Sequence, residues 1–304
     1  MDKPRLLITL GDVAGIGPEI VAKAWPKLPE FCTPTVVGDP DRLPAGVPCV
    51  NPSAADLSGV RLGGVSAEAG RAAYDWLVYA IDECLAGRAD GIVTCPLHKE
   101  GLHAAGVDYP GHTEILAART GAKSHAMLLY DDELPLAVAH VTLHRSLRSI
   151  FPHITRESVL DTIRLLNGIV PRLTGKPARV GVMALNPHAS DGGLFGDEEA
   201  TIITPAVAAA KAEGIDAEGP IPSDAMFLPH VRKRFTGVAA MYHDQGHIAM
   251  KLLGGRRAVN VTAGLPIVRT SVAHGTAYDI AGKGVADESS LVNAVRVAAR
   301  LAVK

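Results

Sequence analysis

Short apolar runs alternate along this chain with longer segments whose apolar residues recur at steps of three and four. The segment that follows Ser66 shows this most clearly, with Ala73, Trp76, Leu77 and Ala80 on one helical face. The predicted helices cover residues 66–87, 155–167, 197–211 and 288–303. The predicted strands cover residues 5–10, 35–38, 90–94, 125–130, 134–142, 178–185, 238–242 and 258–262. Strands that alternate with helices in this way predict an α/β fold with a largely parallel sheet.

The loops that follow five of these strands carry polar residues suited to catalysis. They come after Leu10, Thr94, Thr142, Leu185 and Tyr242. Open α/β sheets bind ligands outside the carboxyl ends of their strands. We therefore expect these five loops to converge on one crevice.

Length, charge and cysteine usage restrict the class of protein. A chain of 304 residues predicts two lobes or one large α/β domain, and without an internal repeat or a low-complexity linker any division into lobes is discontinuous. A formal net charge of −2 argues against a nucleic acid as the main partner. Isolated cysteines without C-x-x-C spacing favour a reduced, cytoplasmic protein. The apolar runs are too short for a signal peptide or a membrane span.

Histidines stand in three of the strand-end loops. His243 lies in A-M-Y-H-D-Q-G-H, His144 in V-T-L-H-R-S and His188 in N-P-H-A-S-D-G-G. Three imidazoles with an open fourth position form a recurring type of catalytic zinc site. His140 and His247 each lie four residues from one of these histidines, and spacing alone does not decide which member of a pair binds metal. Structural hydrogen bonding is the alternative role for all of them.

Two further strand-end features have structural explanations. Gly11, Gly15 and Gly17 in G-D-V-A-G-I-G-P-E do not fit the dinucleotide fingerprint G-x-G-x-x-G, and a tight strand-to-helix turn accounts for them. Cys95 ends a predicted strand, as a nucleophile does in some enzymes. In the local sequence no aspartate or glutamate sits next to a partner histidine, and a buried thiol is usually inert.

Charged and amide side chains in the C-terminal third are candidates for binding an anion. Lys251, Asn260 and Arg269 are spaced nine residues apart, and Lys and Arg donate charge-assisted hydrogen bonds to carboxylate or phosphate. Solvation at the surface is the alternative, and it suits Arg256 and Arg257 better than Arg269, which follows the apolar L-P-I-V. The next segment, H-G-T-A-Y-D-I-A-G, is glycine-rich and suited to surround a nucleotide.

Several motifs occur in one order along nearly the whole chain: G-D-V-A-G-I-G-P-E, Y-P-G-H-T-E, N-P-H-A-S-D-G-G, M-Y-H-D-Q-G, G-L-P-I-V-R-T-S and H-G-T-A-Y-D-I-A-G. Together they resemble the 4-hydroxythreonine-4-phosphate dehydrogenase family of vitamin B6 synthesis. The resemblance implies the two-lobed αβα fold of isocitrate and isopropylmalate dehydrogenases, with a central cleft, in a homodimer. We expect residues 1–125 with 255–304 to form the nucleotide-side lobe. Residues 126–254 are expected to form the lobe with the metal ligands and the dimer contact.

The resemblance also implies roles for individual residues. The family's divalent-metal ligands match His144, His188 and His243, one of them reaching in from the partner subunit. Its substrate-binding residues match His112, Thr113, Lys251, Asn260 and Arg269. The loop that holds the adenosine part of NAD in related dehydrogenases matches Gly275, Thr276 and Asp279. Lys251 and Asp224, which matches an aspartate of the family's cleft, are both candidates for moving protons.

The activity implied by the resemblance is an NAD-dependent, metal-assisted oxidation of 4-hydroxythreonine 4-phosphate in pyridoxal phosphate synthesis, with decarboxylation to 3-amino-2-oxopropyl phosphate. Histidine ligands favour zinc, with magnesium, manganese and cobalt as alternatives. Ala273 and Cys95 depart from the family, which usually has an acidic and a small residue there. Y-P-G-H-T-E, Q-G-H-I and Y-D-I-A-G-K-G lean towards a sister group that oxidises D-threonate or D-erythronate 4-phosphate to dihydroxyacetone phosphate. A metal-dependent lyase or hydrolase without NAD is the alternative from a different class.

Overall fold

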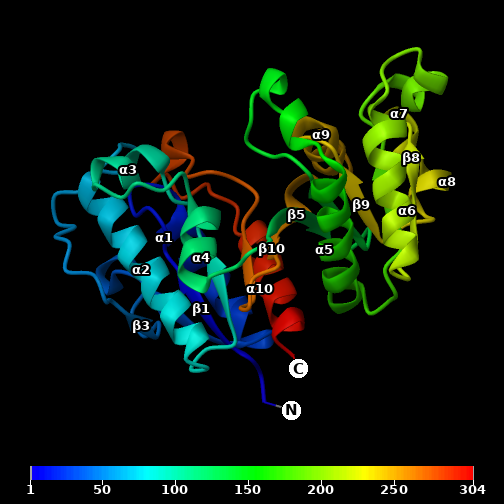
Figure 1. The fold of residues 1–304 in the computed structure, drawn as a ribbon. Helices are drawn as coiled ribbons and strands as arrows, with labels where there is room; N and C mark the ends of the chain where they lie inside the picture. The colour runs from blue at the N-terminus through cyan, green and yellow to red at the C-terminus, as the bar shows by residue number, and fades with distance from the viewer. Residues whose placement is uncertain (1, 304) are drawn as a thin grey trace. The chain divides into compact units, whose positions relative to one another are not determined.

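The chain folds into two compact units in the computed structural model, which describes residues 2–303 (Figure 1). One unit comprises Met1–Lys123 together with Leu265–Lys304, and the other comprises Ser124–Gly264. The first unit is therefore discontinuous in sequence. It contains both the blue N-terminal strands and the red C-terminal helix of Figure 1.

The first unit is built on a parallel sheet in the order β3-β2-β1-β4-β11. Its strands are β1 (Arg5–Thr9), β2 (Thr33–Val37), β3 (Cys49–Val50), β4 (Gly91–Thr94) and β11 (Arg269–Ser271). Its helices are α1 (Gly17–Ala24), α2 (Ala67–Leu85), α3 (Lys99–Ala104), α4 (His112–Thr120) and α10 (Ser289–Ala302). Every residue of β4 is buried, so both faces of the sheet are covered there, and α2 and α10 both pack on β1 and β4.

The second unit has a mixed sheet in the order β10-β5-β6-β9-β7-β8. Its strands are β5 (Ala126–Asp131), β6 (Leu136–His140), β7 (Val180–Met183), β8 (Ala217–Ile221), β9 (Gly237–Ala240) and β10 (Val259–Ala263). Its helices are α5 (Arg156–Thr174), α6 (Thr204–Ala212), α7 (Ser223–Met226), α8 (Pro229–Arg232) and α9 (His243–Gly254). The fully buried strand β6 is contacted by both α5 and α9. Because β10 pairs antiparallel with β5, the chain stays in this unit beyond residue 254, where the sequence analysis placed the boundary.

The helix starts predicted at residues 66 and 155 are confirmed. Ser66 caps α2 by accepting a 3.1 Å hydrogen bond from the backbone N–H of Ala69, and Thr155 caps α5 in a reciprocal pair with Ser158. The strands β5 and β6, which follow each other in the sequence, pair antiparallel. Helix α5 runs beyond residue 167 to Thr174 because its later turns still bury apolar side chains.

One element that carries candidate chemistry was wrongly expected to be a loop. The segment after Tyr242 forms α9, and His243 is its first residue. Gly246 makes this packing possible, since a Cβ there would lie 2.4 Å from His140 Nε2. The strands β6, β9 and β7 run parallel, so the segments with His144, His243 and His188 all follow carboxyl ends at one edge of this sheet. No helix within residues 2–303 has both the length and the apolar character needed to cross a bilayer.

Candidate active site

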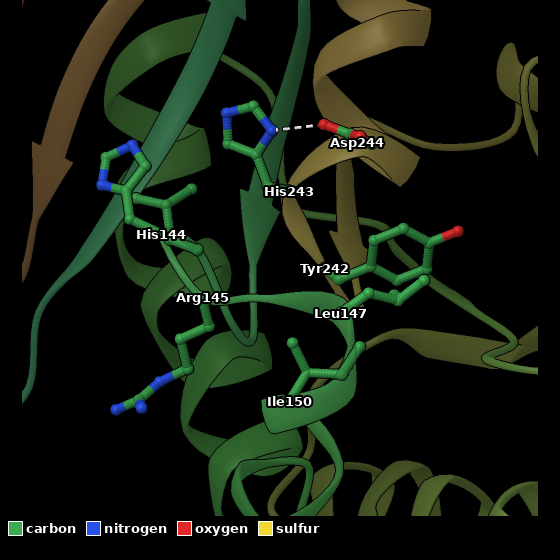
Figure 2. A pocket seen from close by; sticks show the side chains of 8 residues that line it. His144, Arg145, Leu147, Ile150, Tyr242, His243 and Asp244 are labelled. Carbon is green, nitrogen blue, oxygen red and sulfur yellow. Dashed lines mark hydrogen bonds and ion pairs between the residues drawn. The ribbon is translucent and has the colours of Figure 1, made fainter.

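Two of the predicted metal ligands lie together in the second unit. The ring centroids of His144 and His243 are 5.7 Å apart. Their segments are joined just before them, because the backbone N–H and the hydroxyl of Thr142 both donate to the carbonyl of Met241, at 3.1 and 2.7 Å. The two imidazoles border a pocket of about 350 Å³ that Arg145 and Ile150 also line (Figure 2).

Asp244 fixes the orientation of the His243 ring. Its Oδ1 lies 2.7 Å from His243 Nδ1, the contact drawn as a dashed line in Figure 2. When Nδ1–H donates to this carboxylate, Nε2 keeps its lone pair for a ligand. Metal-binding histidines commonly donate their second nitrogen to a carboxylate in this way.

Two more histidines, His140 and His247, pack behind this pair. His247 Nδ1 lies 3.1 Å from His140 Nε2, and the His247 ring stacks on that of His243 with centroids 3.8 Å apart. Burial, with the neighbouring imidazoles, lowers the pKa of His140 to about 3 and that of His247 to about 4. Both rings are therefore neutral at pH 7 and act as packing support for His243.

The third predicted ligand, His188, is exposed and stands apart from this pair. Its ring has a neighbour in Phe195, with centroids 6.3 Å apart. Within residues 2–303, no group of three or more His, Cys, Asp or Glu side chains is placed to hold a metal ion. A single chain therefore brings together two of the three predicted imidazoles.

The residues predicted to bind substrate or move protons in this unit lie on different elements. Asp224 is exposed on α7 and lines a second pocket of about 470 Å³ together with Ile248 and Leu252 of α9. Lys251 is exposed on α9 and is close enough to lower the pKa of His247. Asn260 on β10 has a buried Oδ1 without a hydrogen-bond donor among the residues described. That acceptor is suited to a donor group on a ligand.

In the first unit, Arg269 and His112 form a second group of predicted substrate-binding residues. Arg269 is 2% exposed and donates a 2.7 Å hydrogen bond to the hydroxyl of Thr94. Burial lowers its pKa to about 10, which still leaves the guanidinium charged at pH 7. Burial and the charge of Arg269 lower the pKa of His112, so this imidazole is neutral. Thr113 follows in the first turn of α4, with a backbone N–H available for an anion.

The glycine-rich turn after β1 serves close packing, as the sequence analysis argued. A Cβ on Gly11 would lie 2.2 Å from the carbonyl oxygen of Pro96, and one on Gly15 would lie 2.6 Å from that of Thr276. The backbone N–H of Ile16 donates to the same Thr276 carbonyl at 3.0 Å. The turn therefore holds the predicted cofactor loop in place.

Asp12 also anchors this cofactor loop, through a hydrogen bond with Tyr278. It is 1% exposed and accepts a 2.5 Å hydrogen bond from the hydroxyl of Tyr278, on which His98 stacks with ring centroids 4.8 Å apart. Tyr278 lies between the predicted cofactor residues Thr276, which is buried, and Asp279, which is exposed, as is Gly275. The anchored tyrosine thus fixes the backbone that carries them.

Sequence reasoning missed Asp12 and Asp244. Asp244 had a signal, since a carboxylate directly after a candidate ligand can orient it. Asp12 had none, because its partner Tyr278 is 266 residues away in the sequence. Burial raises the pKa of the Cys95 thiol to about 12, so it stays protonated and unreactive.

The profile of the family described as "Pyridoxal phosphate biosynthetic protein PdxA" matches residues 30–298. The chain belongs to the PdxA family. This PdxA family member is 46% identical over 327 residues to the 4-hydroxythreonine-4-phosphate dehydrogenase of Beijerinckia indica subsp. indica, a match that covers 100% of this chain and 96% of that protein.

Two more relatives complete the comparison. The D-threonate 4-phosphate dehydrogenase of Salmonella typhimurium is 40% identical to this PdxA family member over 329 residues, covering 99% of this chain and 100% of the relative. The crystal structure of 4-hydroxythreonine-4-phosphate dehydrogenase from Klebsiella pneumoniae matches with a TM-score of 0.87 at 38% identity, covering 99% of this chain and 98% of that one. The predicted family and fold class are confirmed, and the chain is an enzyme of a dehydrogenase family.

Proposed function

We propose that this chain is a cytoplasmic, NAD-dependent and divalent-metal-dependent dehydrogenase that oxidises and decarboxylates 4-hydroxythreonine 4-phosphate. The observation that carries the proposal is the His144–His243 pair, with Asp244 behind it, on an open pocket of a PdxA family member. A specific observation favours one second candidate, D-threonate 4-phosphate. A relative named D-threonate 4-phosphate dehydrogenase is 40% identical and covers 99% of this chain.

The donor set fits a borderline-soft divalent ion. His144 and His243 supply two imidazoles, and Asp244 orients one of them, as in known zinc sites. Imidazole nitrogens favour zinc or cobalt over magnesium and manganese, which prefer oxygen ligands. When bound, such an ion lowers the pKa of an alcohol and polarises the carbonyl group that replaces it.

The chain's own residues bind and orient the substrate and the cofactor. Arg269, charged and buried, pairs with a phosphate or carboxylate, and His112 and Thr113 offer donors beside it. Asn260 uses its buried Oδ1 to accept from a substrate hydroxyl or amine. Lys251 or Asp224 moves the proton at the reacting end.

The loop with Gly275, Thr276 and Asp279 is proposed to bind the adenosine part of NAD. Bound NAD accepts the hydride, which is chemistry of the cofactor itself. The protein's contribution is a loop already fixed before binding by the Thr276 carbonyl and by Asp12. A pre-ordered loop loses less conformational entropy on binding.

We further propose a homodimer in which the partner subunit supplies His188. Large apolar side chains of the second unit are exposed, including Leu252 at 81% and Leu194 at 76%. A subunit interface would remove such exposed apolar side chains from water. His188 is exposed beside Phe195 and does not join His144 and His243 in its own chain.

The first experiment measures NADH formation. The purified chain is incubated with NAD and Zn²⁺, Co²⁺ or Mn²⁺, and with each of the two acid phosphates in turn. NADH formation that disappears with a chelator supports the proposal, and the ratio of kcat/KM for the two acids assigns the substrate. Metal-dependent turnover of either acid without NADH would instead show the lyase or hydrolase class.

A second experiment tests the shared site by co-expressing His144→Ala chains with His188→Ala chains. If His188 comes from the partner, each mixed dimer has one intact site, and activity recovers to about a quarter of wild type by two-fold symmetry and random pairing. The matched control co-expresses His144→Ala with His243→Ala. Both sites of that mixed dimer are damaged, so it stays inactive. Recovery in the control, or none in the first mixture, contradicts the shared site.

A further inference from the structure

The segment that carries His188 has a backbone that side-chain-bearing residues rarely adopt. Of the five non-glycine residues with positive φ among residues 2–303, four are consecutive here, from His188 (φ 54°) to Asp191 (φ 45°). Gly192 continues the left-handed run at φ 70°. Each such residue costs roughly 1–2 kcal/mol relative to the right-handed form, so the surroundings must hold the turn in place.

Packing of the turn's own side chains does not provide that hold. His188 and Asp191 are exposed, and Ser190, at 4% exposed, is the buried residue of the segment Pro187–Gly193. The hydroxyl of Ser190 donates to Oε2 of Glu199. The turn is therefore attached to the body of the unit through this carboxylate.

Glu199 collects hydrogen-bond donors just before the turn and within it. Its Oε1 accepts from the backbone N–H groups of Leu185 at 2.8 Å and Asn186 at 2.7 Å. Its Oε2 accepts from Asn186 Nδ2 at 2.9 Å and from Ser190. With four donors on two oxygens, the carboxylate ties the segment just after β7 to the middle of the left-handed run.

The helix start that bears Glu199 is itself irregular. Residues Glu199–Ile203 form a π-helical turn ahead of α6, and both of its end residues are buried. Such turns are rare and often occur at functional sites, because they redirect a side chain that an α-helix would place elsewhere. Glu199 is 3% exposed in this position.

We propose that Glu199 is a positioning residue that holds the left-handed turn and thereby presents His188 outward as a metal ligand. This proposal rests on the ligand role given to His188 in the proposed function. Glu199 itself contacts neither His188 nor a bound group. Its effect on metal binding passes through the backbone of residues 186–190 alone.

The test compares Glu199→Gln with a matched control on the neighbouring residue. A glutamine at 199 keeps the size of the side chain, but its NH₂ group faces the NH₂ of Asn186, so the four-donor arrangement is lost. Glu198→Gln is the control, because Glu198 accepts from Asn186 Nδ2 at 2.7 Å and a glutamine oxygen still accepts that bond. The full chain is freed of metal and titrated with Co²⁺, and binding is followed by the cobalt absorption bands.

We expect Glu199→Gln to weaken Co²⁺ binding on the order of 10- to 100-fold, as for other residues that orient a ligand, and Glu198→Gln to leave it unchanged. The same change is then made in a His188→Ala background. If Glu199 acts only through His188, it causes no further loss there. An equal loss in both backgrounds, or none in the wild-type background, overturns the proposal.

Two further measurements separate the possible failures. If Glu199→Gln does not fold, Ser190→Ala removes one of the four hydrogen bonds, and a smaller loss of Co²⁺ affinity in the same direction supports the proposal, whereas unchanged affinity overturns it. If His188→Ala keeps full Co²⁺ affinity, the ligand set of the proposed function fails together with this inference. If His188→Ala loses affinity and Glu199→Gln does not, the inference alone fails.

Discussion

Two strand-end turns of this protein use opposite backbone solutions. The turn after β1 places glycine where space is short, and a Cβ on Gly11 would meet the Pro96 carbonyl at 2.2 Å. The turn after β7 has open space around Gly192, yet it keeps side chains at His188 and Asp191 in the left-handed region. The first turn uses residues without a side chain, so its backbone can pack closely against neighbouring carbonyls. The second turn keeps its side chains at the cost of a strained backbone.

Each turn is also held by a buried carboxylate, and the pKa values of the two are shifted in opposite directions. Burial raises the pKa of Asp12 above its usual value, against hydrogen bonds from Tyr278 and Ala14. Burial also acts to raise the pKa of Glu199, but hydrogen bonds from Asn186 and Ser190 outweigh it and bring the pKa below its usual value. The glycine-rich turn holds the predicted cofactor loop by close packing, whereas the left-handed turn keeps its side chains and is held by a dedicated carboxylate.

The largest effect on activity is expected from His188→Ala, which tests whether the left-handed turn serves catalysis. The variant should lose on the order of 10³-fold in kcat, because several kcal/mol of charge stabilisation depend on the metal ion. Without metal, its thermal unfolding should match that of metal-free wild type, since the side chain is exposed. Steady-state NADH formation and calorimetry measure the two quantities. A variant with near wild-type kcat would break the contrast, because the strained turn would then serve no chemistry.

The strands and capped helices of this fold could be predicted because their signals are local. Buried apolar runs marked β1, β4 and β9, and Ser66 and Thr155 marked the helices they cap. Helix α9 was missed because H-D-Q-G is a sequence typical of loops, and its helical form depends on His140 packing under Gly246.

The candidate site could be predicted only in part, for a similar reason. Motif resemblance named His144 and His243, and the structure brings their rings together. The left-handed turn had no local signal, because its anchor Glu199 comes from a π-helical turn further along the chain. The Asp12–Tyr278 bond joins residues 266 positions apart, which no local pattern can reveal.

A smaller effect is expected from placing alanine at the two turns. Gly11→Ala adds a Cβ against the Pro96 carbonyl at φ +66°, and it should lower the free energy of unfolding by roughly 2–4 kcal/mol. Gly192→Ala, at φ +70° with nothing near its Cβ, should cost about 1–2 kcal/mol. Urea unfolding of both variants at one protein concentration measures the difference. Equal losses of stability would contradict this difference, because they would mean that the close contact of a Cβ at residue 11 with the Pro96 carbonyl adds nothing to the cost of the backbone conformation.

The smallest effect is a difference in pH dependence between the two buried carboxylates. Glu199 has a lowered pKa in the folded chain, so its contribution to stability is present above its usual value of 4.5 and is lost as the pH falls. Asp12 has a raised pKa, so its contribution is full below 3.8 and is lost as the pH rises through the folded-state value.

Variants of the two carboxylates should therefore respond to pH in opposite directions. As the pH rises from the acid range, the stability lost in Glu199→Gln relative to wild type should grow, and that lost in Asp12→Asn should shrink, each by at most about 1.4 kcal/mol per pH unit. Urea unfolding at a series of pH values gives both slopes. Each variant also loses hydrogen bonds, but that loss is a constant offset, so the sign of the slope isolates the charge state. If the two slopes of stability loss against pH had the same sign, the pKa values of Asp12 and Glu199 would be shifted in the same direction, which would contradict the prediction.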